Sequence, residues 1–289
     1  MAALPKKVDV EVWADSLKKE FFNLVRCSTE EETLKASRDF QRYLDSQSRD
    51  LSSETVQKFF TDVNYQISVL IKGNTAEKIA ALVATRALLK SEVEGYIGNK
   101  IVQLGVYVRD CSLHPDIRVM KMAVHCLKTL ASMEGTLAAE FVEEEIRRAF
   151  ASLEAQSEPS SARGQADLTS VRRHSAVLCL EVLAKNSPTL FFVHIGPFFN
   201  LIWVGLCDKQ ITVRESSAAA LHAVLYLIGM RRSPSIKDWY KHLYQRAKNG
   251  LDCQSSNIPV EPLHGTSKLV KRFGVLWRMM CTVSTPSCT

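Results

Sequence analysis

The sequence predicts an all-α fold in which pairs of helices stack one after another. Three observations favour it: 46% of the 289 residues are hydrophobic, long stretches hold neither Gly nor Pro, and one helical pattern recurs along the chain. A β-sandwich or barrel would need a turn signal about every 8–12 residues, and 12 Gly and 9 Pro are too few for that.

The recurring pattern is a pair of residues four positions apart, the first small and the second apolar or small. Such residues share one face of a helix, and the small member lets another helix approach closely. The pairs are Ala36/Phe40, Ala80/Ala84, Ala123/Leu127, Ala176/Leu180 and Ser217/Leu221. Their first members are 44, 43, 53 and 41 residues apart, close to the period of about 40–47 residues of HEAT and armadillo helix-pair repeats. We therefore expect an α-solenoid of about eleven or twelve helices, with these ten residues at the helix-packing positions.

The pairs lie in segments that open with polar or capping residues, as helices do. These segments, expected to be second helices, are 31–44, 74–89, 114–131, 170–184 and 208–225. The first helices are expected at 52–72, 135–153, 186–207 and 233–250. Within 135–153, the pairs Glu143–Arg147 and Glu144–Arg148 are four positions apart and suit an exposed helical face.

The segment 186–207 contains its own start and interruption signals. Ser187 is placed to cap the helix and Pro188 to occupy its first position, where a missing N–H does no harm. Pro197 lies inside the same segment, so we expect a kink near 193–197.

The longest spacing contains the turn-rich run QSEPSSARGQADLT at 156–169. This composition is typical of a loop, so we interpret 156–169 as a loop insertion between two repeats.

The chain shows no cluster of residues that suits catalysis, a metal or a cofactor. Its eight cysteines include no C-x-x-C motif and lie mostly in apolar helical runs, where Cys acts as a small hydrophobic residue. Its seven histidines form no pair four positions apart and no Cys–His zinc spacing. There is no phosphate-binding glycine loop, nucleophile elbow or kinase catalytic set, and the acidic run VEEEI (142–146) is interpreted as a solvated face. We expect no enzymatic activity, no cofactor and no metal.

Two apolar stretches deserve comparison with membrane spans. The stretch 218–230 is too short, and 188–207 is interrupted by His, Gly, Pro and Asn. The opening MAALPKKVDVEVWADSLKKE lacks the features of a signal peptide. We therefore expect a soluble cytoplasmic protein without a transmembrane segment.

The run SVRRHSAVLCLEVLA (170–184) holds arginines, a histidine, a serine and a cysteine, and could be a reactive site or a phosphorylation target. Ser175 precedes the small member Ala176, so a phosphate there would have to break helix packing. Arg173 holds the position that Arg214 holds in the next repeat, which places the arginines near a helix start. We interpret the run as a structural part of the fourth repeat.

The net charge of +6 is concentrated in residues 231–278, where ten Lys and Arg face three acidic residues. This segment could bind an acidic partner or nucleic acid. It lacks interleaved stacking aromatics and any nucleic-acid motif, which disfavours nucleic acid.

Several stretches resemble a known family. They are STEEETLKASRDFQRYL, FVEEEIRRAF, RRHSAVLCLEVLA, PTLFFVHIGPFFNLIWVGLCDKQITVRESSAAALHAVL and DWYKHLYQRAKNGLD. From about residue 12 to about residue 264 the chain is similar to the N-terminal HEAT region of the target of rapamycin (TOR) kinases.

The resemblance implies a non-catalytic scaffold arm of a large Ser/Thr kinase of the phosphatidylinositol-3-kinase-related family. In that family the arm docks Raptor or Rictor and contacts another TOR protomer, in the cytoplasm and at lysosomal or other endomembrane surfaces. The kinase, rapamycin-binding and FAT regions lie outside the matching part, so no catalytic residue can be carried over. The alternative is an independent HEAT-repeat adaptor that binds an acidic partner or nucleic acid through 231–278.

The resemblance ends after Gly265, where TSKLVKRFGVLWRMMCTVSTPSCT follows. We expect a solenoid domain over 1–264 and a divergent, poorly ordered tail over 265–289. The tail is expected to reflect a truncated or mis-spliced gene model, or else a short isoform or paralogue.

Limited proteolysis tests the repeat boundaries. We expect the first cleavage within 156–169, because a loop between two repeats is the most accessible backbone. Mass spectrometry of the early fragments would locate it. A first cut inside 175–225 would contradict the proposed repeat register.

Overall fold

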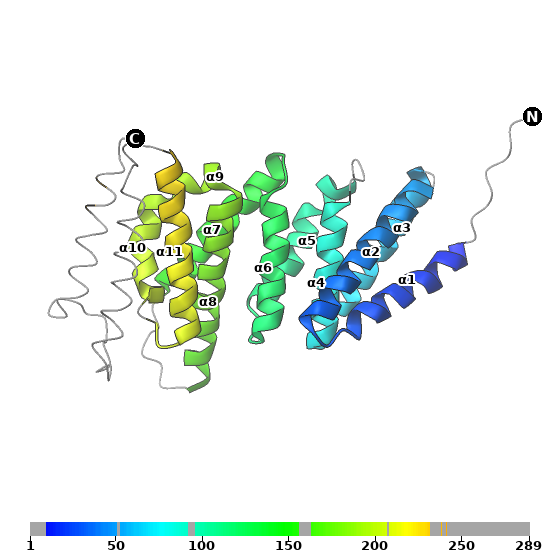
Figure 1. The fold of residues 1–289 in the computed structure, drawn as a ribbon, viewed down its shortest axis with the longest axis horizontal. Helices are drawn as coiled ribbons and strands as arrows, with labels where there is room; N and C mark the ends of the chain where they lie inside the picture. Colours follow the sequence, from blue (N-terminus) through cyan, green and yellow to red (C-terminus); the bar gives the residue numbers. More distant parts are fainter. Residues whose placement is uncertain are drawn as a thin grey trace, which may run out of the picture. The chain divides into compact units, whose positions relative to one another are not determined.

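The computed structural model describes residues 10–50, 53–91, 96–155, 163–206 and 208–231, together with Asp238 and Lys241. Within these ranges the chain forms eleven helices and no strand (Figure 1). This confirms the predicted all-α solenoid class. The predicted helix at 233–250, apart from the two isolated residues, and the predicted tail at 265–289 lie outside the described residues.

The chain divides into two compact units, Met1–Ala138 and Ala139–Thr289. The boundary falls inside the domain predicted over 1–264, in the first turn of the helix that begins at Thr136.

The first unit contains six helices that alternate between the two members of successive pairs. They are α1 (Val10–Val25), α2 (Glu30–Asp50), α3 (Ser53–Leu70), α4 (Thr75–Lys90), α5 (Tyr96–Ser112) and α6 (Ile117–Ala131). The helix α4 packs against each of the other five. Its buried residues therefore occupy several sides of the helix, from Ala80 to Leu89.

Capping residues fix where these helices begin. Asn74 and Glu77 form a reciprocal capping box at the start of α4: the Asn74 side chain accepts from the Glu77 amide at 3.0 Å, and the Glu77 carboxylate accepts from the Asn74 amide at 2.6 Å. Asp116 caps α6 by accepting from the Arg118 amide at 2.9 Å. Both starts lie within the segments predicted from their polar openings.

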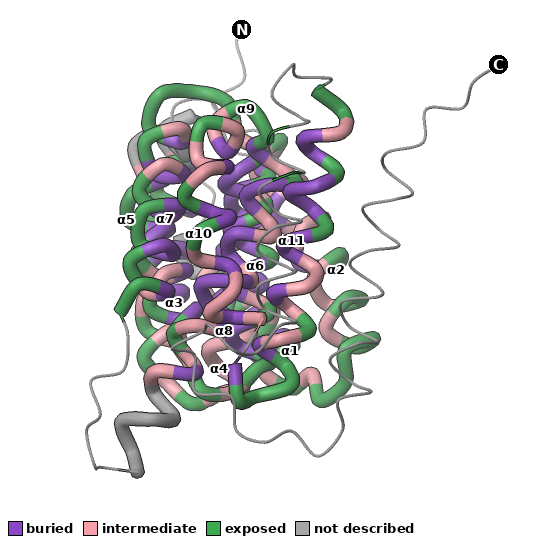
Figure 2. Tube along the Cα trace, turned by 90° about the vertical axis from the view of Figure 1, so that its left-hand side faces the viewer, coloured by how far each residue is buried: buried purple, intermediate pink, exposed green. Residues whose placement is uncertain are grey.

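The second unit contains the remaining helices. They are α7 (Thr136–Glu154), α8 (Arg163–Asn186), α9 (Pro188–Phe192), α10 (Ile195–Leu206) and α11 (Ile211–Arg231). The helices α8 and α11 are neighbours, and α11 also contacts α9 and α10. Figure 2 shows that helices are buried on the sides that meet other helices and exposed on the rest.

The kink predicted near 193–197 is a complete break between α9 and α10. The turn is closed by the His194 amide, which donates to the Phe191 carbonyl at 2.9 Å. Pro197 then falls at the third position of α10, where its missing N–H would have had no intrahelical partner. The break therefore places the proline in the first turn of a new helix.

The predicted loop at 156–169 is wrong at its C-terminal end, because α8 already begins at Arg163. Residues 156–162 lie outside the described part. The sequence of 163–169 includes good helix formers such as Arg, Gln, Ala and Leu, which offset one glycine costing about 1 kcal/mol. As a result Arg173 lies well inside α8, and not near its start as predicted.

Among the described helices, none combines the length and the apolar character needed to cross a membrane.

Substitution of Gly205 by Ala tests how closely α10 approaches its neighbours. A Cβ at Gly205 would lie 2.2 Å from the Ser217 hydroxyl and 3.1 Å from a Val177 methyl, so a neighbour would have to move. We expect Gly205→Ala to lower the free energy of unfolding by about 1–3 kcal/mol. Urea unfolding followed by circular dichroism would measure it.

The control is the double variant Gly205→Ala/Ser217→Ala, which removes the clashing hydroxyl. We expect it to recover part of the loss, so that the two effects are not additive. Full additivity, or no loss in the single variant, would contradict the close approach.

Candidate functional site

The ten predicted packing residues lie in the helices where the repeat pattern places them. Nine are buried, with exposed fractions of 3% or less: Phe40, Ala80, Ala84, Ala123, Leu127, Ala176, Leu180, Ser217 and Leu221. Ala36 is half-buried because it borders a shallow surface cavity. The contact of Gly205 with Ser217 supports a packing role at that position, and the role of the set stays a prediction.

A buried ion pair joins α8 to the turn before α11. The Arg173 guanidinium donates through Nε to the Asp208 carboxylate, whose side chain is fully buried. The same carboxylate accepts from the Gln210 amide at 2.8 Å and from the Ser170 hydroxyl at 3.4 Å. Arg214 donates to the Asp208 backbone carbonyl at 2.7 Å. Asp208 therefore holds two consecutive repeats together and also organises the first turn of α11.

The other polar residues of 170–184 are also used in packing. Ser175 is 3% exposed, and the His174 ring nitrogen Nε2 lies 3.1 Å from the Ser216 hydroxyl on α11. Burial raises the pKa of the Cys179 thiol to about 12, so at neutral pH the thiol is protonated and a poor nucleophile. The histidine, serine and cysteine of this run thus make contacts within the fold.

The acidic run at 142–146 is only partly a solvated face, which corrects the prediction. Glu145 is 7% exposed, whereas Glu144 is half exposed. His194 Nε2 lies 2.9 Å and 3.0 Å from the two carboxylate oxygens of Glu143. This contact links α7 to the break between α9 and α10. The run therefore contributes contacts inside the second unit.

The predicted charge pairs on α7 are formed in part. Arg147 lies 3.6 Å from Glu143 as predicted, and also 3.6 Å from Glu144. Arg148 pairs with Glu145 at 3.9 Å, one position away from the predicted partner Glu144. The exposure of both arginines makes these pairs weak contributors to stability.

The buried thiols of the first unit are equally unreactive. Burial raises the pKa of the Cys126 thiol to about 12 and that of Cys111 to about 11. Cys126 Sγ donates to the Leu82 carbonyl at 3.1 Å and so joins α6 to α4. Both residues behave as small core residues, as their apolar surroundings in the sequence predicted.

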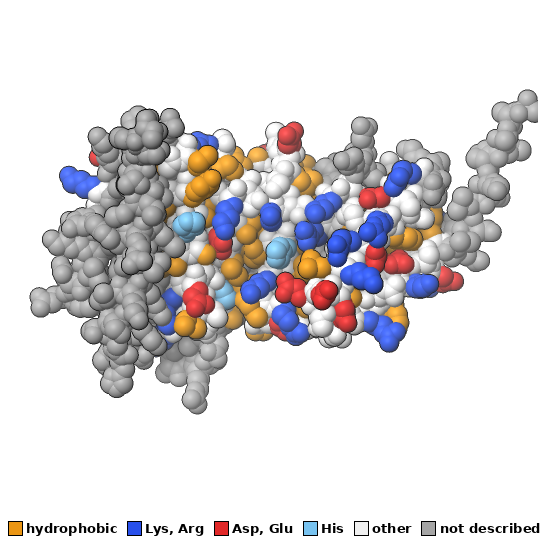
Figure 3. All heavy atoms as spheres, in the orientation of Figure 1, with side chains coloured by type: hydrophobic (Ala, Val, Ile, Leu, Met, Phe, Trp, Pro, Cys, Tyr) orange, Lys and Arg blue, Asp and Glu red, His pale blue; other side chains and the backbone are white. Residues whose placement is uncertain are grey.

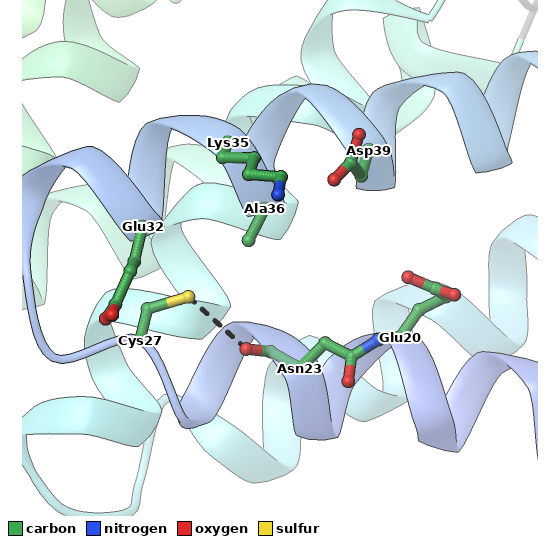
Figure 4. A pocket seen from close by; sticks show the side chains of 7 residues that line it. All are labelled: Glu20, Asn23, Cys27, Glu32, Lys35, Ala36 and Asp39. Atoms are coloured by element: carbon green, nitrogen blue, oxygen red, sulfur yellow. Dashed lines mark hydrogen bonds between the residues drawn. The ribbon is translucent and has the colours of Figure 1, made fainter.

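A shallow cavity of about 260 Å³ lies between α1 and α2 (Figure 4). Its wall includes Glu20, Glu32 and Asp39, with Lys35 among them. The Glu32 carboxylate is already engaged by the Ser28 amide and hydroxyl, which lower its pKa. In the part of the chain that the structure describes, no three His, Cys, Asp or Glu residues are placed to hold a metal ion. Cys27 also lines the cavity, and its Sγ donates to the Asn23 carbonyl at 3.3 Å. Burial and the nearby Glu32 carboxylate raise the pKa of this thiol, which disfavours the thiolate that a nucleophile requires.

Exposed apolar side chains form a feature that the repeat pattern did not reveal. Tyr65 and Val69 are four positions apart on α3, and Val102 and Val106 are four positions apart on α5, with exposed fractions of 40–63%. The Asn64 amide donates to the Gln103 side chain at 3.2 Å, so these helices lie side by side at this point. The spacing of the four residues was visible in the sequence, but their outward direction depends on how α3 and α5 pack.

The predicted basic segment 231–278 lies outside the described residues except for Arg231, Asp238 and Lys241. Arg231 is engaged within the second unit: its guanidinium lies 4.5 Å from the centre of the Phe192 ring and donates to the Thr189 hydroxyl at 3.0 Å. The binding role predicted for this segment stays a prediction.

Comparison with known proteins identifies relatives that are similar in sequence. No family model matches the chain. The kinase tor1 of Schizosaccharomyces pombe is 32% identical over 248 residues, which cover 86% of this chain and 10% of the kinase. The chain matches a segment of the TOR kinases. Kinase TOR2 of Saccharomyces cerevisiae and TOR of Arabidopsis thaliana agree, at 29% and 31% identity over 82% and 78% of the chain.

These comparisons confirm the predicted resemblance to TOR kinases and also limit it. The chain spans about a tenth of the length of the curated relatives it matches. A solved engineered protein aligns with 93% of the chain at 13% identity and a TM-score of 0.41. The resemblance to a segment of the TOR kinases therefore rests on the sequence matches.

Substitution of Asp208 by Ala tests the buried ion pair. The variant leaves Arg173, whose side chain is 14% exposed, without its carboxylate. We expect the free energy of unfolding to fall by about 3–5 kcal/mol, because an uncompensated buried charge is costly. Urea unfolding of the full chain would measure the change.

The matched control is Asp39→Ala, which removes a carboxylate that pairs with Arg42 at 2.9 Å on an exposed surface. We expect a loss of at most about 1 kcal/mol there. Equal losses in the two variants would show that burial of Asp208 does not decide its contribution.

Proposed function

We propose that this chain is a non-catalytic protein-interaction scaffold, a segment of a TOR-type kinase that acts through the surfaces of its helices. The observation that carries the proposal is the match to TOR kinases over 86% of the chain and 10% of the S. pombe kinase. The catalytic activity of such a kinase would belong to other parts of the protein.

The described residues fit a scaffold better than a kinase domain. Protein kinases hold ATP with a glycine-rich loop and a lysine on a strand, whereas the described part of this chain is entirely helical. Cys126, His174 and His194 are occupied in contacts between structural elements. Its exposed apolar residues on α3 and α5 are the type of surface that partners cover.

The partners we propose are a Raptor- or Rictor-like adaptor and a second TOR protomer, in the cytoplasm or at an endomembrane surface. The resemblance to TOR kinases supports them. Contacts along a helical-repeat surface are spread over many helices, so loss of a single exposed side chain should matter little.

Binding of the purified full chain to a purified Raptor-like adaptor from the same organism tests the proposal. We expect co-elution in size-exclusion chromatography, retained when Val193 or Met230 is replaced by Ala, since each is one exposed side chain among many. A Rictor-like adaptor is tested in parallel. Failure of both adaptors to bind, together with salt-steep binding to RNA, would favour the independent adaptor and contradict the TOR scaffold.

A further inference from the structure

The helices α4 and α6 of the first unit carry positive charge with almost no acidic residues. No acidic residue occurs in α6, and α4 has only Glu77, which is used in its capping box. Two of their cationic side chains are held by neighbouring oxygens: Lys78 donates to the Gly73 carbonyl, and Arg118 pairs with Asp116. The remaining cations have no such partner among the described residues.

The remaining cations are Arg86, Lys90, Lys121 and Lys128. Together with the imidazole of His125 they form what we call the α4–α6 cationic surface. Members of the set within one helix are three, four or seven positions apart, so they share a face of that helix. The hydrogen bond from Cys126 to the Leu82 carbonyl joins the two helices, which places the two rows side by side. Figure 3 shows Lys and Arg side chains gathered with a histidine over α4 and α6.

The charges of this surface are close enough to affect one another. Burial lowers the pKa of Lys90, and the charges of Arg86 and Lys128 lower it further. The pKa of His125 is lowered by burial first and then by Arg86 and Lys128. Like charges held together favour the binding of an anionic group that relieves their repulsion.

We propose that the α4–α6 cationic surface binds an acidic segment of a partner polypeptide. This rests on the proposed scaffold function and names the chemistry of one of its docking surfaces. Two neighbouring rows of cations can pair with carboxylates on successive turns of one acidic segment, which gives both affinity and register.

Two features favour a polypeptide over nucleic acid. The Glu30 carboxylate lies near enough to His125 to raise the pKa of the imidazole, which opposes the effects of burial, Arg86 and Lys128. Glu31 and Glu32 follow Glu30 in the first turn of α2. The Glu30 carboxylate borders the cationic surface and would repel a phosphate backbone that continued past it. A partner polypeptide can present a basic or neutral residue at that edge.

The second feature is the position of exposed aromatic side chains. Those of the described chain, Phe22, Tyr65 and Tyr226, lie on α1, α3 and α11. Binding of single-stranded nucleic acid relies on aromatic side chains that stack on bases. None of the described ones lies on α4 or α6.

Fluorescence anisotropy of a labelled poly-L-glutamate peptide with the purified full chain tests the proposal. The variant is Lys90→Glu/Lys121→Glu/Lys128→Glu, which reverses three exposed charges of the surface. The matched control, Lys19→Glu/Lys58→Glu/Lys72→Glu, makes the same change in net charge at exposed positions on or next to α1 and α3. Circular dichroism would show that both variants keep the helical content of the parent.

We expect the peptide to bind the parent with an affinity that falls as salt rises, and the surface variant to weaken binding about tenfold or more. The control variant should weaken it no more than about twofold, because charges at distant exposed positions are largely screened. Equal weakening in the two variants would overturn the proposal. Tighter binding of single-stranded RNA or of phosphatidylserine vesicles through the same three lysines would also overturn it. Neither result changes the outcome of the adaptor-binding experiment, which tests the scaffold function separately.

Discussion

A helix pair of this size cannot bury its apolar side alone, so each pair depends on the pair beside it. In the first unit this dependence is concentrated in α4, because every other helix of the unit packs against it. In the second unit it is concentrated at the meeting of α8, α10 and α11, where Gly205 and Ser217 let the backbones come close. Loss of space at these points would disturb several helices at once, because each helix there has neighbours on more than one side.

The repeat period was predictable because helix packing requires small residues at regular positions. Ser217 illustrates this: a small residue was expected from the spacing, and the structure places it fully buried against Gly205. Pro197 likewise predicted an interruption of the helix, because proline is disfavoured in helix interiors. The structure has a full break there, with Pro197 in the first turn of α10. The extent of this interruption depends on tertiary contacts, which the local sequence does not specify.

Burial of charge was the part that local sequence could not predict. Arg173 and Asp208 are 35 residues apart, and neither the α8 sequence around Arg173 nor the turn before α11 identifies the other as its partner. Glu145 was expected on a solvated face because its neighbours in the sequence are acidic, yet it is buried. In the same way the acid-free composition of α6 is visible in the sequence, but its alignment with the cations of α4 requires the fold.

The ion pair between Arg173 and Asp208 also bears on the order in which the chain can fold during synthesis. Chains emerge from the ribosome N-terminus first, and domains begin to fold as they emerge. When α8 has just been made, Arg173 has no carboxylate to meet, because Asp208 is added 35 residues later. The final docking of α8 must therefore wait for the turn before α11. Translation therefore sets a minimum time for this step.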